Sequence, residues 1–375
     1  MDLIDAGRTR VRPLLRSLRR LLEGPGAVTP PRLSWQGREA RTPDYRPGAG
    51  LYAAMLGDST VRDFAIASPP VMFWRQWFGN QRNPFLDRVD DDLDSIFERL
   101  ARRGPTRVVE YACSGASVGE ARTWSRRRFQ WMANVKTLSE QIEDLERRTP
   151  FPDLTLVWIG HNNLDFVTQL PRFSRSGDLS VAMEGIAMAF AAAFRRDLAR
   201  LIEGAGRSGR PAAIVVYGLV NPEATRQARD EARTIRAEDR SRYRYLEVAE
   251  GRFPPLRPEH GDRLVTLSRR VSAELERAVD ELGGASSVPP HVHVLSSDTT
   301  ARVDFSRAEL LSDDDAWHAS YEGKVLLADA LFDGLAPALE ILAAGARWLA
   351  ACRDGAGCPG ASRHRHTSSG GGSSR

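Results

Sequence analysis

Three side chains of the types used in nucleophilic catalysis stand at spacings that would let them act together. Ser59 follows Asp58 at the end of the segment 51–60 (LYAAMLGDST), which reads as a short buried strand running into a turn. A hydroxyl on such a support is exposed and rigidly held, as a nucleophile requires. His318 can take its proton, and Asp315, three residues earlier in DAWH, can reach the imidazole Nδ1 and fix the tautomer. The three residues are a candidate triad for acyl transfer.

Acyl transfer also needs hydrogen-bond donors for the negative charge that develops on the carbonyl oxygen. The backbone N–H of Ser59, the backbone N–H of Gly115 and the side-chain amide of Asn162 are candidates. Each of these residues lies just past the carboxyl end of a different predicted strand. In an open parallel sheet, sites form beyond the carboxyl ends of the strands. We therefore expect the three donors to converge at one edge of the sheet.

The elements that must position these groups follow an alternating pattern. A strand and turn are predicted at 51–60, and further strands at 106–112, 153–159, 211–218 and 291–295. Helices are predicted at 91–102, 180–203, 264–282 and 321–349, with another ending near 146. The segment 153–159 (DLTLVWI) is almost continuously apolar, as expected of a parallel strand covered on both faces. Strands that alternate with helices imply right-handed crossovers. The predicted fold class is α/β with a doubly wound parallel sheet of about five strands.

Other residues compete for the same roles. Asp313 and Asp314 can replace Asp315 as the orienting group, although the spacing favours Asp315. Cys113 carries a nucleophilic thiol, but no histidine is spaced to serve it. A buried small apolar residue is the better interpretation of this cysteine.

Four short blocks resemble those of the SGNH or GDSL-type serine hydrolases, in the same order. They are GDST at 57–60, CSGAS at 113–117, GHNN at 160–163 and DAWH at 315–318. The resemblance spans about residues 51–340. It implies a flavodoxin-like three-layer α/β/α fold and hydrolysis of esters, or transfer of acyl groups, through an acyl-enzyme on Ser59. It also implies that neither a metal ion nor another cofactor takes part.

The blocks depart from the family pattern at two positions. Thr60 stands where the family has leucine, at a position that packs rather than reacts. Asn163 replaces the usual aspartate after Asn162 and so alters a supporting hydrogen bond. The neighbouring block residues Asp58, Gly160, His161 and Asn163 are candidate supports of the site. His161 can form a pocket wall or compete with His318 as the base.

Composition narrows the class of protein. The chain of 375 residues is 42% apolar and 27% charged, as in ordinary globular proteins. A net charge of +4 is spread along the chain and indicates an arginine-rich surface. The three cysteines form no disulfide framework, and no run of about 18 apolar residues predicts a membrane span. His291 and His293 are expected at the surface rather than on a metal, because no cysteine or carboxylate has ligand spacing.

The predicted organisation centres on one hydrolase-like domain. Along the chain we expect a basic amphipathic helix at 1–23, a linker at 24–50, the domain at 51–350 and a disordered tail at 351–375. The domain has insertions at about 61–103 and 222–260. Arginines interrupt residues 8–22 too often for a signal peptide, so a cytoplasmic location is expected. That helix can lie on an anionic membrane or dock on protein. Specific nucleic-acid binding is disfavoured, because leucines rather than stacking aromatics separate the arginines.

The leading hypothesis is serine-dependent hydrolysis of a carboxylic ester, with a small-molecule or lipid-like ester as the substrate. The two insertions would set the choice of substrate. Transfer of the acyl group to an alcohol is one alternative. A binding module that keeps the fold without catalysis is another.

Overall fold

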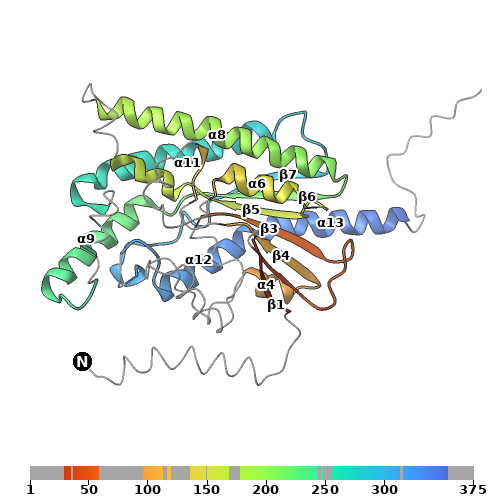
Figure 1. Ribbon diagram of the computed structural model, residues 1–375, viewed down its shortest axis with the longest axis horizontal. Coiled ribbons are helices and arrows are strands. Elements are labelled where there is room, and N and C mark those ends of the chain that lie inside the picture. Colours follow the sequence, from red (N-terminus) through yellow and green to blue (C-terminus); the bar gives the residue numbers. More distant parts are fainter. Residues whose placement is uncertain are drawn as a thin grey trace, which may run out of the picture.

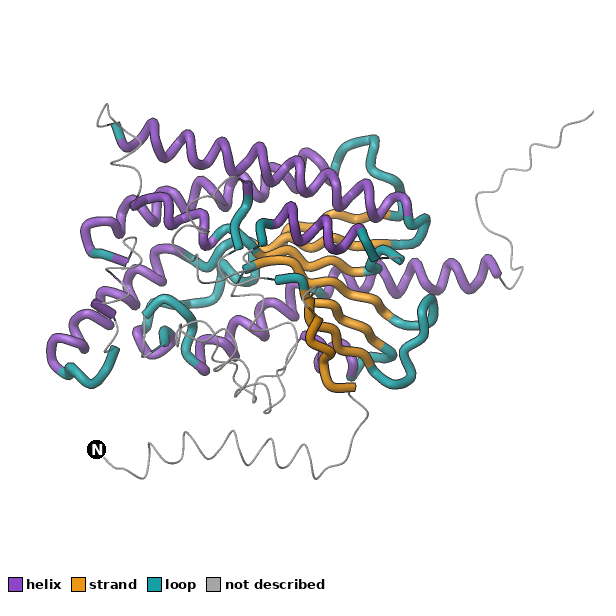
Figure 2. The backbone as a smooth tube through the Cα atoms, viewed as in Figure 1, coloured by secondary structure: helices purple, strands orange, loops and turns teal. Residues whose placement is uncertain are grey.

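The computed structural model describes residues 29–34, 37–58, 96–112, 116–119, 136–148, 150–168, 178–243, 246–247, 250, 256–312 and 316–353. A seven-stranded sheet lies between two layers of helices (Figures 1 and 2). Several predictions fall outside the described residues: the amphipathic helix, the aromatic part of the first insertion, the tail beyond 353, Thr60, Cys113, Asp313, Asp314 and the site residues Ser59, Gly115 and Asp315.

The sheet confirms the predicted doubly wound topology. In spatial order its strands are β1 (Thr29–Ser34), β2 (Gly37–Arg41), β4 (Thr106–Glu110), β3 (Leu51–Gly57), β5 (Leu154–Trp158), β6 (Ala212–Tyr217) and β7 (Val292–Ser297). The strands from β4 to β7 in this order are all parallel. The chain therefore runs from β3 to one side, then back across to β5 on the other. Such a reversal opens a crevice at the carboxyl ends of the strands, where ligands bind in open α/β sheets.

The segment predicted as a linker at 24–50 instead carries two antiparallel strands, β1 and β2. Strand β2 pairs with β4, and the carboxylate of Glu39 accepts two hydrogen bonds from Arg107, at 2.9 and 3.1 Å. The extra strands extend the edge of the parallel sheet beyond β4. The two strands pair mainly through main-chain hydrogen bonds, so the side-chain pattern of the segment does not indicate that it forms strands.

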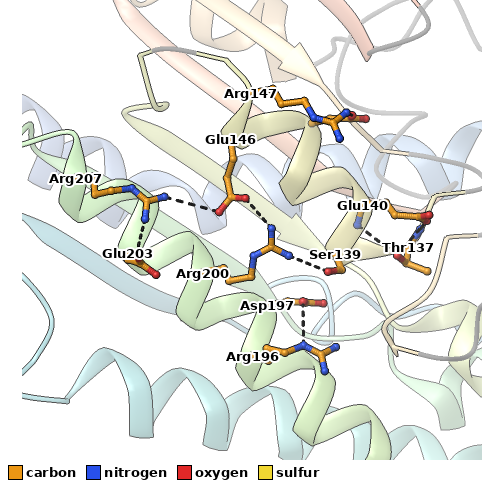
Figure 3. A network of polar contacts seen from close by, with 11 residues as sticks. Thr137, Ser139, Glu140, Glu146, Arg147, Arg196, Asp197, Arg200, Glu203 and Arg207 are labelled. Atoms are coloured by element: carbon orange, nitrogen blue, oxygen red, sulfur yellow. Dashed lines mark hydrogen bonds and ion pairs between the residues drawn. The ribbon is translucent and has the colours of Figure 1, made fainter.

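One face of the sheet is covered by α6 (Leu138–Glu146), α8 (Leu179–Arg207) and α11 (Gly261–Gly283). Thr137 and Glu140 form a capping box at the start of α6, and Asp178 caps α8. Charged groups join α6 to α8 at their outer edge (Figure 3). Arg200 donates to the Ser139 hydroxyl at 3.0 Å and to the Glu146 carboxylate at 2.6 Å.

The other face is covered by α4 (Ile96–Ala101), α9 (Pro222–Glu238), α12 (Tyr321–Gly334) and α13 (Ala336–Arg353). Short 3-10 helices, η2 (His161–Thr168), η4 (Pro258–His260) and η5 (Ala308–Leu310), occupy the connections. None of the described helices has both the length and the hydropathy needed to cross a bilayer.

The helix predicted at 321–349 is in fact two helices, α12 and α13, separated at Leu335. Gly334 ends the first helix, and a proline at 337 lies in the first turn of the second. Proline has no N–H and its ring clashes with the carbonyl four residues earlier, so one helix cannot run through this position. The break lets both helices pack on the sheet face that contains Trp158 and Tyr217.

Candidate active site

The described candidate residues gather beyond the carboxyl ends of β3 and β5. Asp58 directly follows β3, and His161 and Asn162 open η2 after β5. His318 lies in the connection between η5 and α12. His161, Asn162 and His318 line one pocket, although His318 is far from the other two along the chain.

The main chain just before Asp58 is held by a buried glutamine. Gln141 of α6 accepts a hydrogen bond from the Gly57 N–H and donates one to the Gly57 carbonyl, both at 2.8 Å. This pair anchors the end of β3 where the chain leaves for residues 58 and 59. Sequence reasoning missed Gln141, although its place on the apolar face of α6, beside Leu138, Ile142 and Leu145, was a signal that it has a buried partner.

Asp58 and His161 contact each other directly. The Asp58 side chain is fully buried, and its Oδ2 lies 3.1 Å from Nδ1 of His161. The imidazole also packs edge-on against Trp158, with the ring centroids 5.3 Å apart and an angle of 85° between the rings. His161 thus stands as a fixed part of the pocket wall.

The two asparagines of η2 bind the second sequence block. Asn162 donates through Nδ2 to the carbonyl of Ala116 at 2.9 Å. Asn163 accepts from the Val118 N–H at 3.0 Å and donates to the Val118 carbonyl at 2.9 Å. The amide of Asn162 carries a second N–H group besides the one that binds Ala116. The hydrogen bonds tie residues 116–119 to the start of η2.

Replacement of Asn163 by aspartate is expected to destabilise the fold by about 1–3 kcal/mol. An ionised carboxylate cannot donate to the Val118 carbonyl, and it would be buried at a position where the asparagine is 3% exposed. Burial would raise the pKa of the new carboxyl, so the loss is full above that pKa and shrinks as the pH falls. Urea unfolding at pH 5 and pH 8 measures both effects. Equal stability of the two proteins at pH 8 would contradict the assigned donor.

Main-chain hydrogen bonds connect residues within the segment that carries His318. The Ser312 N–H donates to the His318 carbonyl at 2.8 Å, and the Ala316 N–H donates to the Ser312 carbonyl at 3.0 Å. Ala316 is fully buried with φ at +51°, a conformation that non-glycine residues rarely adopt. Surrounding contacts must hold such a residue in place.

One of those contacts comes from α9, within the predicted insertion at 222–260. Arg229 is buried, and its Nε donates to the Ala316 carbonyl at 3.2 Å. The same guanidinium lies over the Trp317 ring, 4.6 Å from the centroid. Helix α9 therefore contacts and stabilises the two residues immediately before His318. Sequence reasoning missed this role, because the partners are far apart along the chain.

The pocket lies between the start of η2, the helices α9, α11 and α12, and the connection that carries His318. It contains about 850 Å³ of space between protein atoms, part of it open to solvent. Its lining is largely apolar and includes Leu164, Leu219, Leu264, Phe305, Trp317 and Leu327. Among the described residues of the lining, the charged side chains are Arg229 and Lys324. An apolar cavity with a few convergent polar groups is the usual form of a small-molecule site.

The described ranges contain no group of three or more histidine, cysteine or carboxylate side chains placed to hold a metal ion. His293 lies on β7, at the edge of the sheet away from the pocket.

Comparisons with known proteins give only distant likenesses. No family model and no curated protein matches the sequence. LAE5, an alpha/beta hydrolase enzyme from the metagenome of Lake Arreo in Spain, shares 15% identity over 78% of this chain and 97% of its own, with a TM-score of 0.38. TesA shares 12% identity over 76% of this chain and 99% of its own, with a TM-score of 0.30. YXIM_BACsu from Bacillus subtilis shares 13% identity over 78% of this chain and 58% of its own, with a TM-score of 0.34.

Proposed function

We propose that this protein is a serine hydrolase that cleaves a carboxylic ester through an acyl-enzyme on Ser59. The observation that carries the proposal is the pocket shared by Asn162 and His318. It lies beyond the strand end that leads through Asp58 to Ser59. The resemblance of four ordered sequence blocks to the SGNH hydrolases adds independent support.

In the proposed mechanism, His318 takes the proton of the Ser59 hydroxyl as Oγ attacks the ester carbonyl. Asp315 holds the imidazole in the tautomer whose Nε2 accepts this proton. The backbone N–H groups of Ser59 and Gly115 and the remaining amide N–H of Asn162 bind the oxyanion. His318 then gives its proton to the departing alcohol, and water releases the acid by the same steps in reverse.

The apolar lining supports a small-molecule or lipid-like ester as the substrate. Arg229 and Lys324 add positive charge to an otherwise hydrophobic wall, so the site offers both apolar surface and polar anchors.

A fluorophosphonate probe tests the proposal, because it reacts with a serine only where a base and an oxyanion hole activate the hydroxyl. We expect one covalent label per chain, found by peptide mass on Ser59, and slower labelling when a short p-nitrophenyl ester competes. Heat-unfolded protein is the matched control for non-specific reaction. No labelling of the folded protein would favour a binding module that keeps the fold without the chemistry.

A further inference from the structure

The contact between Asp58 and His161 forms a second carboxylate–imidazole pair in the same site, distinct from the proposed pair of Asp315 and His318. Nδ1 of His161 lies 3.1 Å from the Asp58 carboxylate. An ionised carboxylate can only accept hydrogen bonds, so Nδ1 carries a hydrogen, and in a neutral ring this is the one N–H. Nε2 is then an acceptor with its lone pair directed away from Asp58.

The ring is held on a second side by Trp158. The two rings meet edge to face, and the Trp158 indole is itself fixed by a hydrogen bond from Nε1 to the Gly218 carbonyl at 2.8 Å. An imidazole with one nitrogen bonded and its plane packed has little freedom to turn. The direction of its remaining nitrogen is therefore set before any ligand arrives.

That remaining nitrogen is buried and has no hydrogen-bond partner among the described residues. His161 lines the pocket together with Asn162 and His318. Buried polar atoms without partners are rare in folded proteins, and a ligand that supplies the missing group is one established explanation. The charged side chains among the described lining residues, Arg229 and Lys324, carry only hydrogen-bond donors.

We propose that the Asp58–His161 pair recognises a hydroxyl group on the alcohol part of the substrate, so that the substrate class is esters of polyhydroxy alcohols. A neutral Nε2 requires a donor, and a hydroxyl supplies one. In the proposed function, on which this inference rests, His318 passes its proton to the departing alcohol. Because His161 lines the same pocket as His318, which would protonate the departing alcohol, we assign the recognised hydroxyl to that alcohol.

Two small esters with the same acyl group test the proposal: 1-monobutyrin, which carries two free hydroxyls, and propyl butyrate, which carries none. We expect the wild-type protein to hydrolyse monobutyrin with a kcat/KM about 10-fold higher. In His161→Phe, which keeps a ring but no nitrogen, the ratio of the two kcat/KM values is expected to fall towards one.

His161→Asn is the matched control for folding. Its amide can still donate to Asp58 from the position of Nδ1, but it has no acceptor at the position of Nε2. Its thermal midpoint is expected to stay nearer to that of the wild type than the midpoint of His161→Phe. A fall of the ratio in both variants supports recognition of the hydroxyl.

Three results would overturn the inference. The wild type could hydrolyse the two esters equally well, or it could hydrolyse neither. The ratio of the two kcat/KM values could also stay unchanged in both variants. Labelling of Ser59 by fluorophosphonate separates these results from failure of the proposed function. A labelled protein without preference for monobutyrin refutes only the role of His161. An unlabelled protein refutes the serine mechanism, and this inference with it.

Discussion

Replacement of Ser59 by alanine is expected to lower kcat for short p-nitrophenyl esters by about 10⁴- to 10⁶-fold. Alanine removes the oxygen that would form the acyl-enzyme and leaves the oxyanion donors and the pocket in place. Only the acceleration due to binding and to those donors then remains. Steady-state hydrolysis, with the fluorophosphonate label as a second measurement, determines the loss.

Ser114 provides the control, because it is a serine of the neighbouring sequence block that has no role in the proposed mechanism. Ser114→Ala is expected to keep its fluorophosphonate label at Ser59. Circular dichroism must show that both variants are folded. Undiminished ester turnover by Ser59→Ala would remove this hydroxyl from the mechanism and return the search for a nucleophile to other side chains of the pocket.

Replacement of Asp197 by asparagine is expected to stabilise the protein at pH 8 by about 3 kcal/mol. Asp197 lies on the inner face of α8 and is fully buried. Its nearest cation in Figure 3, Arg196, approaches only to 3.9 Å. Arg196, the Ser139 hydroxyl and Arg200 lower the pKa of this carboxyl by less than burial raises it. Burial raises the pKa of this carboxyl to about 6, against an ordinary value of 3.8.

The sign of the effect follows from proton binding. Since the folded state binds this proton more tightly than the unfolded state, the penalty is absent below about pH 4 and complete above about pH 6. The difference of about two pKa units corresponds to about 3 kcal/mol. An asparagine carries no charge, so the variant should lack this loss of stability between pH 4 and pH 7. Urea unfolding across this pH range measures the free energy of unfolding of both proteins.

Glu203 lies on the same helix but is exposed and paired with Arg207. Glu203→Gln is expected to change the free energy of unfolding by less than about 1 kcal/mol and to leave its pH dependence nearly unchanged. If the free energies of unfolding of the wild type and Asp197→Asn changed in parallel across the pH range, Asp197 would not be the group responsible for the loss of stability.

The sequence alone was sufficient to predict the parallel part of the sheet. Each of its strands is a short apolar run, and helical periodicity marks the segments between them, so local patterns carry this information. The pattern of apolar runs did not predict β1 and β2, which lie in a segment rich in proline, glycine and arginine and pair through their main chains. It also failed to divide the last helix, although the signal was present in Gly334 and the proline at 337.

Which polar groups meet was decided only by the tertiary structure. Gln141 reaches Gly57 across 84 positions of sequence, His161 reaches Asp58 across 103, and Arg229 reaches Ala316 across 87. The sequence indicated which of these residue types could do chemistry, and it ordered the elements that carry them, because propensity and periodicity are local properties. A hydrogen bond instead depends on distance in space, and the crossovers of the sheet set that distance only after the chain has folded.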